Sequence, residues 1–96
     1  MAEEKVKLVW TKPALNHLRE AHDYIEIDSP GVAARLIDRI EIAINRLRMF
    51  PQMGRPSARP DTRELVIPQT PFIAVYLVRQ ETVFILAILH GARNWK

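Results

Sequence analysis

The chain has no cysteine among its 96 residues. Disulfide bridges and thiolate metal sites are therefore excluded. Its three histidines, His17, His22 and His90, are too scattered along the sequence to indicate a zinc site. We expect neither a metal nor any other cofactor.

Long apolar runs are also missing. No stretch approaches the ~20 residues that a membrane-spanning helix needs. The acidic start, Met1-Ala2-Glu3-Glu4-Lys5, lacks the hydrophobic core of a secretion signal. We therefore expect a cytoplasmic protein without membrane contact. A chain this short forms one domain, residues 1–96, and buries only about two-thirds of its unfolded surface, so a partner can add to its stability.

Acidic residues are scarce in the second half of the chain. Residues 1–48 carry eight basic and eight acidic side chains, whereas residues 49–96 carry six basic and three acidic ones. The net charge of +3 therefore lies entirely in the second half, and basic residues are densest between positions 46 and 63. Such a patch attracts nucleic acid or an acidic protein, although a solvated arginine-rich loop has the same composition.

The first 27 residues predict a strand followed by a helix. Residues 5–10 alternate between polar and apolar side chains, which is typical of a half-buried strand. Thr11 is suited to cap a helix, and apolar residues recur at helical spacing over about residues 12–27.

A break separates this helix from a second one over about residues 30–50. Asp28 or Ser29 is suited to cap the second helix, and Pro30 suits a first helical position. Because the break is short, the two helices should pack as an antiparallel hairpin.

The rest of the chain predicts one long loop and three strands. Residues 50–61 contain three prolines and a glycine, which prevent regular structure, and loops of this length are often functional. The expected strands are residues 63–67, 72–79 and 82–90, the last two joined by the two-residue turn Gln80-Glu81. The order β-α-α-β-β-β indicates an α+β domain, with a helical hairpin packed on one face of a mainly antiparallel sheet.

Both faces of the last two strands are apolar. In residues 72–79, one face is expected to carry Phe72, Ala74, Tyr76 and Val78, and the other Ile73, Val75 and Leu77. In residues 82–90, simple alternation places Val83, Ile85, Ala87 and Leu89 opposite Phe84, Leu86 and Ile88. Two helices cover only one face, so the other is covered either by curling of the sheet and the long loop or by a partner. We favour a partner, because little chain remains to cover it.

Several segments together resemble the RelE/ParE superfamily of toxins from bacterial toxin–antitoxin pairs. The segments are Ser29-Pro30 with Ala33-Ala34-Arg35, Phe50-Pro51-Gln52-Met53-Gly54-Arg55, Thr62-Arg63-Glu64-Leu65-Val66, Phe72-Ile73-Ala74-Val75-Tyr76 and Ile88-Leu89-His90-Gly91-Ala92-Arg93-Asn94-Trp95. No one of them is specific, but their order covers nearly the whole chain. The resemblance implies the fold described above and a cognate antitoxin, which would fit the uncovered apolar face.

The superfamily has two main activities. The RelE-like branch cuts mRNA in the ribosome through basic residues that polarise the phosphate, whereas the ParE-like branch poisons DNA gyrase. At strand positions where RelE-like members place basic residues, this chain holds Glu64, Val66 and Ile73, which cannot stabilise a phosphate. The resemblance is therefore closest to the ParE-like branch. It implies a gyrase poison that is not itself an enzyme, neutralised by a ParD-like antitoxin and reaching operator DNA only through it.

Two alternatives stay open. One is a ribosome-dependent mRNA endonuclease using His90, Arg63 and Arg93, although we favour a structural role for His90 at a strand end, because the set of cations around it is incomplete. The other is a non-toxic binding module.

Candidate binding residues fall into two groups, each with a structural alternative. Target contacts are expected from Arg55, Arg59, Arg63, Arg93 and Trp95, which could otherwise serve solubility, ion pairing or packing of the tail. Antitoxin contacts are expected from Leu18, Ile25, Phe72, Tyr76, Phe84 and Leu86, and the alternative for Tyr76 is the core.

Overall fold

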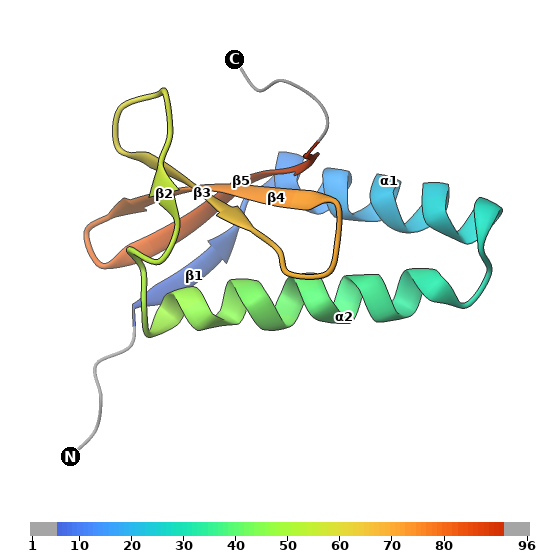
Figure 1. Cartoon of the computed structure of the whole chain (residues 1–96). Coiled ribbons are helices and arrows are strands. Elements are labelled where there is room, and N and C mark those ends of the chain that lie inside the picture. The colour runs from blue at the N-terminus through green and yellow to red at the C-terminus, as the bar shows by residue number, and fades with distance from the viewer. Residues whose placement is uncertain (1–5, 92–96) are drawn as a thin grey trace.

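The computed structural model describes residues 6–91 and confirms the α+β fold (Figure 1). Its elements are β1 (Lys7–Trp10), α1 (Lys12–Asp28), α2 (Val32–Asn45), the short 3-10 helix η1 (Arg46–Arg48), β2 (Arg55–Pro56), β3 (Thr62–Val66), β4 (Phe72–Arg79) and β5 (Thr82–His90). The five strands form one sheet in the order β1-β5-β4-β3-β2, in which only β1 and β5 are parallel. The short edge strand β2 lies within the predicted loop.

The first helix begins where the sequence indicates. The Thr11 hydroxyl accepts a hydrogen bond from the Ala14 backbone N–H at 3.4 Å, which satisfies one of the free donors at the helix start. The same hydroxyl donates to the Ile85 carbonyl at 2.6 Å. Thr11 therefore caps α1 and fastens it to the neighbouring strand β5.

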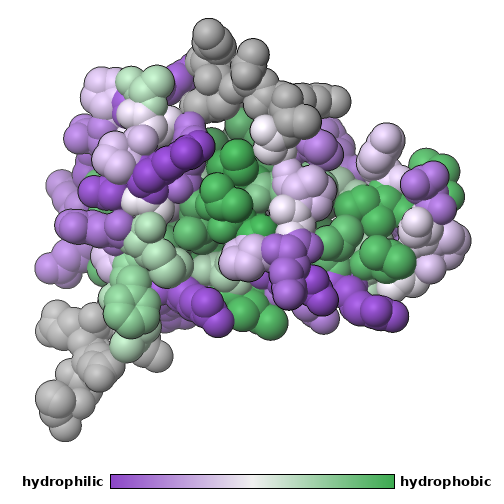
Figure 2. Space-filling model, viewed as in Figure 1, coloured by the Kyte–Doolittle hydropathy of each residue, from purple (hydrophilic) through white to green (hydrophobic). Residues whose placement is uncertain are grey.

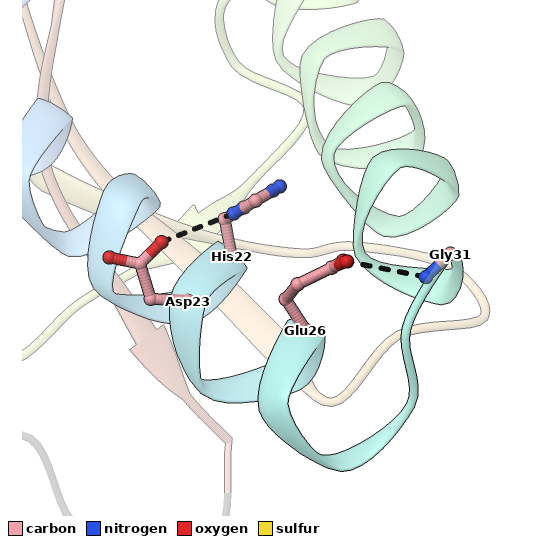
Figure 3. Close-up of polar contacts among 4 residues, drawn as sticks. All are labelled: His22, Asp23, Glu26 and Gly31. Carbon is pink, nitrogen blue, oxygen red and sulfur yellow. Dashed lines mark hydrogen bonds and ion pairs between the residues drawn. The ribbon is translucent and has the colours of Figure 1, made fainter.

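The second helix begins later than the sequence predicts. Neither Asp28 nor Ser29 caps it, and Pro30 precedes it. Gly31 is the cap, with a φ of 89° that side-chain-bearing residues rarely adopt. The carboxylate of Glu26, from the last turn of α1, accepts from the Gly31 N–H at 3.4 Å (Figure 3). The preceding helix thus supplies the acceptor that Gly31 lacks.

Both helices pack on the same face of the sheet. The sheet residues of this face include Tyr76 and Ile85, and they share one core with Ala14 of α1 and with Ile40 and Ile44 of α2. We call this the helix face, and the opposite one the open face. No helix among residues 6–91 is long and apolar enough to cross a membrane.

A bulge in β5 changes which residues occupy each face. Val75 pairs with Ala87, but its neighbour Tyr76 pairs with Ile85, so Leu86 is an extra residue in β5. Beyond the bulge, Ile88 points into the core, while Ala87 and Leu89 turn to the open face. The simple alternation expected across residues 82–90 is therefore wrong past position 85.

Candidate functional site

The loop between η1 and β2 is fastened to the helix face by Tyr76. Its hydroxyl accepts from the Gly54 N–H and donates to the Pro51 carbonyl, each at 2.8 Å. The Tyr76 side chain is fully buried, and its bond to Gly54 is shielded from water, whereas its bond to Pro51 is only part-buried. A single side chain in the middle of β4 therefore holds two points of a loop that lies more than twenty residues earlier in the chain.

Arg63 holds the same loop from β3. Its guanidinium donates to the Gly54 carbonyl at 2.6 Å and to the Gln52 carbonyl at 3.4 Å. Gly54 is buried between these anchors, and an added Cβ would lie 2.7 Å from the Glu64 carbonyl oxygen and 2.7 Å from the Tyr76 hydroxyl. Only glycine fits this close approach of loop and sheet.

The anchoring hydroxyl is neutral under physiological conditions. Burial raises the pKa of Tyr76 above the ordinary value of 10.0, while the hydrogen bond from Gly54 and the charge of Arg63 act in the opposite direction. A neutral hydroxyl can donate and accept at once, as the two loop contacts require.

Two separate groups of polar contacts hold other charged side chains of the loop and the sheet. Glu64 receives the Arg55 guanidinium at 3.2 Å and the Ser57 hydroxyl at 2.9 Å. Asp61 pairs with Arg79 at 3.4 Å. A hollow beside these contacts is lined in part by Gln52, Ser57, Arg59, Asp61 and Arg63. Of the arginines expected to contact a target, Arg63 is bound to the loop carbonyls, and Arg55 pairs with Glu64 while 67% of its side chain stays exposed.

The structure separates the residues expected for RNA cleavage. Arg63 lies opposite Tyr76, whereas His90 lies opposite Phe72, on the far side of β4. They are therefore about 13 Å apart along the strands and about 10 Å apart across them. His90 packs edge-on against the Phe72 ring, with centroids 5.8 Å apart. Arg93 and Trp95 lie outside the described residues.

The other two histidines also serve local structure. His17 on α1 accepts the Ile88 N–H at 3.2 Å, just beyond the bulge in β5, and His22 lies 3.3 Å from Asp23 (Figure 3). Among residues 6–91, no group of three or more His, Asp or Glu side chains is placed to hold a metal ion.

The residues expected to bind an antitoxin occupy three different environments. Phe72 and Tyr76 are buried beneath the helices, so they belong to the core and offer no surface to a partner. Leu18 and Ile25 of α1 are half-buried against the same core, on the helix side. Phe84, on the open face, and Leu86, at the bulge, are half-buried in β5.

The open face is apolar but unevenly exposed. Its centre includes the fully buried Val75 and the half-buried Leu77, and its most exposed apolar residues are Val9 on the edge strand β1 (40%) and Val66 on β3 (56%). No described helix covers this face. Figure 2 shows strongly hydrophobic surface in the middle of the view, over the sheet.

Sequence reasoning missed an exposed apolar patch on the anchored loop. Met49, Phe50 and Met53 are 43%, 61% and 43% exposed, and we call them the Phe50 patch. The signal was present in the Phe-Pro-Gln-Met run, but burial is the usual state of such residues, and only the structure shows that they point outward.

Two helices packed on one face of a five-stranded mixed sheet form an α+β fold of the RelE/ParE-like class of small toxins. The chain belongs to the ParE toxin family of type II toxin–antitoxin systems, whose model matches residues 8–95. It is therefore the toxin component of such a system.

Individual relatives agree with this family. The chain is 38% identical over 95 residues to the protein Y4kP of Sinorhizobium fredii, covering 99% of this chain and 96% of the relative. It is 33% identical over 91 residues to toxin ParE3 of Caulobacter vibrioides, covering 92% and 89%.

Solved structures agree as well. A chain of the chromosomal ParDE system from P. aeruginosa is similar with a TM-score of 0.83 and 26% identity, over 92% of this chain and 98% of that one. A chain of the toxin–antitoxin complex RelBE2 from Mycobacterium tuberculosis shares the fold, with a TM-score of 0.61 and 21% identity over 96% and 98%.

Proposed function

We propose that this toxin acts by inhibiting DNA gyrase and does not cleave mRNA. The observation that carries the proposal is that two charged residues of β3, Glu64 and Arg63, are already bound within the protein. A position where RelE-like nucleases hold a cation is occupied here by Glu64, whose carboxylate is already bound to Arg55 and Ser57. Arg63 is committed to the loop carbonyls, and it lies far from His90. Cleavage would need cations and a proton-transfer group gathered at one phosphate.

We further propose that a ParD-like antitoxin neutralises the toxin by covering the open face. The support is the run of apolar side chains across four strands, from Val9 to Val66, that no described helix covers. The similar chain from P. aeruginosa comes from a ParDE system, which supports the same kind of partner. The toxin would then act in the cytoplasm and reach operator DNA only through its antitoxin.

One comparison of two reactions tests the target. Purified toxin, freed of its antitoxin, is added to gyrase with plasmid DNA and, separately, to translating ribosomes carrying mRNA. We expect loss of supercoiling or trapped cleavage complexes in the first reaction and intact mRNA in the second. A His90→Ala variant serves as the control, since it should leave gyrase inhibition unchanged. Cut mRNA with untouched gyrase would overturn the proposal and make His90 and Arg63 the residues to examine.

A further inference from the structure

The Phe50 patch is an apolar surface at the end of the molecule where α2 passes into the loop. Its three large side chains lie within five positions of each other, and a hollow is lined by Phe50, Pro51, Gln52 and Met53. Figure 2 shows hydrophobic surface at the lower left, over the end of α2 and the start of the loop, beside hydrophilic side chains. Apolar groups clustered in this way usually mark a binding surface.

Hydrogen bonds to the backbone of the loop hold the patch in one conformation. The Phe50 N–H donates to the Arg46 carbonyl at 2.9 Å, and the Met53 N–H donates to the Phe50 carbonyl at 3.0 Å. The next residue, Gly54, is bound by Tyr76 and Arg63 as described above. A partner would therefore bind these side chains without first ordering the backbone, so the cost of ordering the loop on binding is avoided.

Basic side chains flank the patch on the same turn. Arg46 and Arg48 are both exposed, and neither takes part in any ion pair identified among residues 6–91. We infer that the Phe50 patch binds an acidic protein surface, in which an apolar pocket takes Phe50 and Met53 and carboxylates receive Arg46 and Arg48. The surface belongs to the toxin's target, so the inference rests on the proposed function and names the part of the toxin that makes contact.

Two other occupants fit less well. A second copy of the chain meeting the patch symmetrically would place its own Arg46 and Arg48 against those of the first, which like-charge repulsion opposes. Single-stranded nucleic acid binds across several stacked aromatic rings, whereas this patch offers one ring and two thioethers. Methionine instead suits contact with an irregular protein surface, because its side chain adapts its shape.

The Phe50 patch and the open face lie on different sides of the sheet. The loop is anchored to Tyr76 and Arg63 on the helix face, whereas Val66 and Leu77 point to the other side. An antitoxin that binds the open face would leave the patch intact. Substitutions in the patch should therefore remove toxicity without removing antitoxin binding.

The test compares two matched pairs of double variants. Phe50→Ala/Met53→Ala removes the apolar contact, and Tyr24→Ala/Ile27→Ala removes side chains that are 75% and 84% exposed at the far end of the helical hairpin. We measure growth arrest on induction, which needs no knowledge of the target, and gyrase inhibition by the purified proteins. The patch variant should lose at least about tenfold in potency, as hot-spot side chains do, and the hairpin variant should stay within about twofold.

A second set of variants, in which arginines are replaced by glutamine, distinguishes an acidic partner from a purely apolar one. Arg46→Gln/Arg48→Gln and Arg35→Gln/Arg39→Gln each remove two exposed positive charges, the second pair from earlier turns of α2. The first variant should lose potency and also lose most of its dependence on salt, while the second should keep both. Because all these side chains are exposed, each variant should keep the thermal midpoint of the wild type within a few degrees.

Each outcome has a definite meaning. Full growth arrest by both the Phe50/Met53 and the Arg46/Arg48 variants would overturn the inference. Loss of arrest by these variants, in a toxin that leaves gyrase untouched, would support the inference and overturn the gyrase proposal. Loss of RNA or DNA binding with unchanged inhibition of the protein target would assign the patch to nucleic acid, and no growth arrest by the wild type would contradict both proposals.

Discussion

Gly54 is the position where a single methyl group should do the most damage. Its Cβ would meet both a backbone oxygen of β3 and the Tyr76 hydroxyl at 2.7 Å, and the backbone cannot move without shifting the strand. We expect Gly54→Ala to lower the free energy of unfolding by about 1–3 kcal/mol in urea denaturation, as overpacking does elsewhere. Toxicity should fall further than stability, since the loop that carries the Phe50 patch would be displaced.

Gly31→Ala is the matched control for this prediction. Gly31 also has a special role, with a φ of 89°, but no atom lies within 4 Å of an added Cβ. Its substitution should cost about 1 kcal/mol of backbone strain and leave the loop in place. Equal loss of toxicity in both variants would show that general destabilisation, rather than the loop, accounts for the Gly54 result.

Tyr76→Phe should reveal what the buried hydroxyl contributes. The change removes two hydrogen bonds and leaves the Gly54 N–H and the Pro51 carbonyl without these partners, at a cost of about 1–3 kcal/mol. Thermal or urea unfolding near neutral pH measures that cost. A change below about 0.5 kcal/mol would mean that water replaces the hydroxyl and that the loop is not tightly anchored.

The same residue predicts a pH dependence. Because the pKa of Tyr76 is raised in the folded protein, above pH 10 the unfolded chain releases a proton that the folded chain still holds. The stability that Tyr76 contributes is thus complete below pH 10 and is lost as the pH rises through its folded pKa. Wild type should lose more free energy of unfolding above pH 10 than Tyr76→Phe does, whereas parallel pH curves for the two proteins would contradict the argument.

The sequence shows why some residue roles were predictable and others were not. Thr11 acts on a residue three positions away, so its capping role follows from local pattern. The contact between Tyr76 and Gly54 spans twenty-two positions, and nothing local distinguishes this tyrosine from the apolar residues beside it. Its placement in the core, rather than at a partner interface, depends on which face the helices cover.

At the scale of elements, the turn between β4 and β5 stores backbone strain. Gln80 and Glu81 both have positive φ, 54° and 60°, as a two-residue type I′ turn requires, yet neither is glycine or asparagine. Gln80→Asn/Glu81→Gly should therefore raise the free energy of unfolding by about 0.5–1 kcal/mol. The control Gln80→Ala/Glu81→Ala removes the same side chains without relieving the strain, and an equal gain in both variants would rule out the backbone explanation.

Element types followed from hydrophobic periodicity, but boundaries and faces depended on exceptions to it. Most helical and strand segments were predicted at nearly their observed positions, but the second helix was predicted to reach about residue 50, whereas α2 ends at Asn45 and a short 3-10 helix follows it to Arg48. The start of α2 was wrong because Gly31, which looks like a loop residue, takes the cap position. The predicted assignment of β5 residues to the two faces was wrong past Ile85, because one bulge residue, Leu86, reverses the alternation. The two-residue strand β2 was missed because Pro56 is not a residue that predicts a strand.

At the scale of the whole molecule, the fold leaves one sheet face without a helix among the described residues. Val9 and Val66 are its most exposed apolar residues. Val9, Phe84 and Leu77 are paired neighbours on the adjacent strands β1, β5 and β4. In the toxin alone Val9 and Val66 meet water, which is unfavourable for apolar area, whereas Val75 at the centre of the face is already fully buried. We expect antitoxin-free toxin to self-associate weakly, so that its average mass by sedimentation rises with concentration, and to become monomeric when the antitoxin covers the face.

Two double variants locate the cause of that association. Val9→Ser/Val66→Ser replaces the two most exposed apolar side chains of the open face by polar ones, and Tyr24→Ser/Ile27→Ser does the same to more exposed side chains at the hairpin end. If the open face drives association, the first variant should sediment as a monomer and bind antitoxin more weakly, while the second should behave as wild type. If the wild type is monomeric at every concentration, the open face does not drive association. If only the hairpin variant is monomeric, the exposed side chains of the helical hairpin drive association instead. The comparison thus tests whether the apolar composition of β4 and β5 reflects a partner or only the packing of this chain.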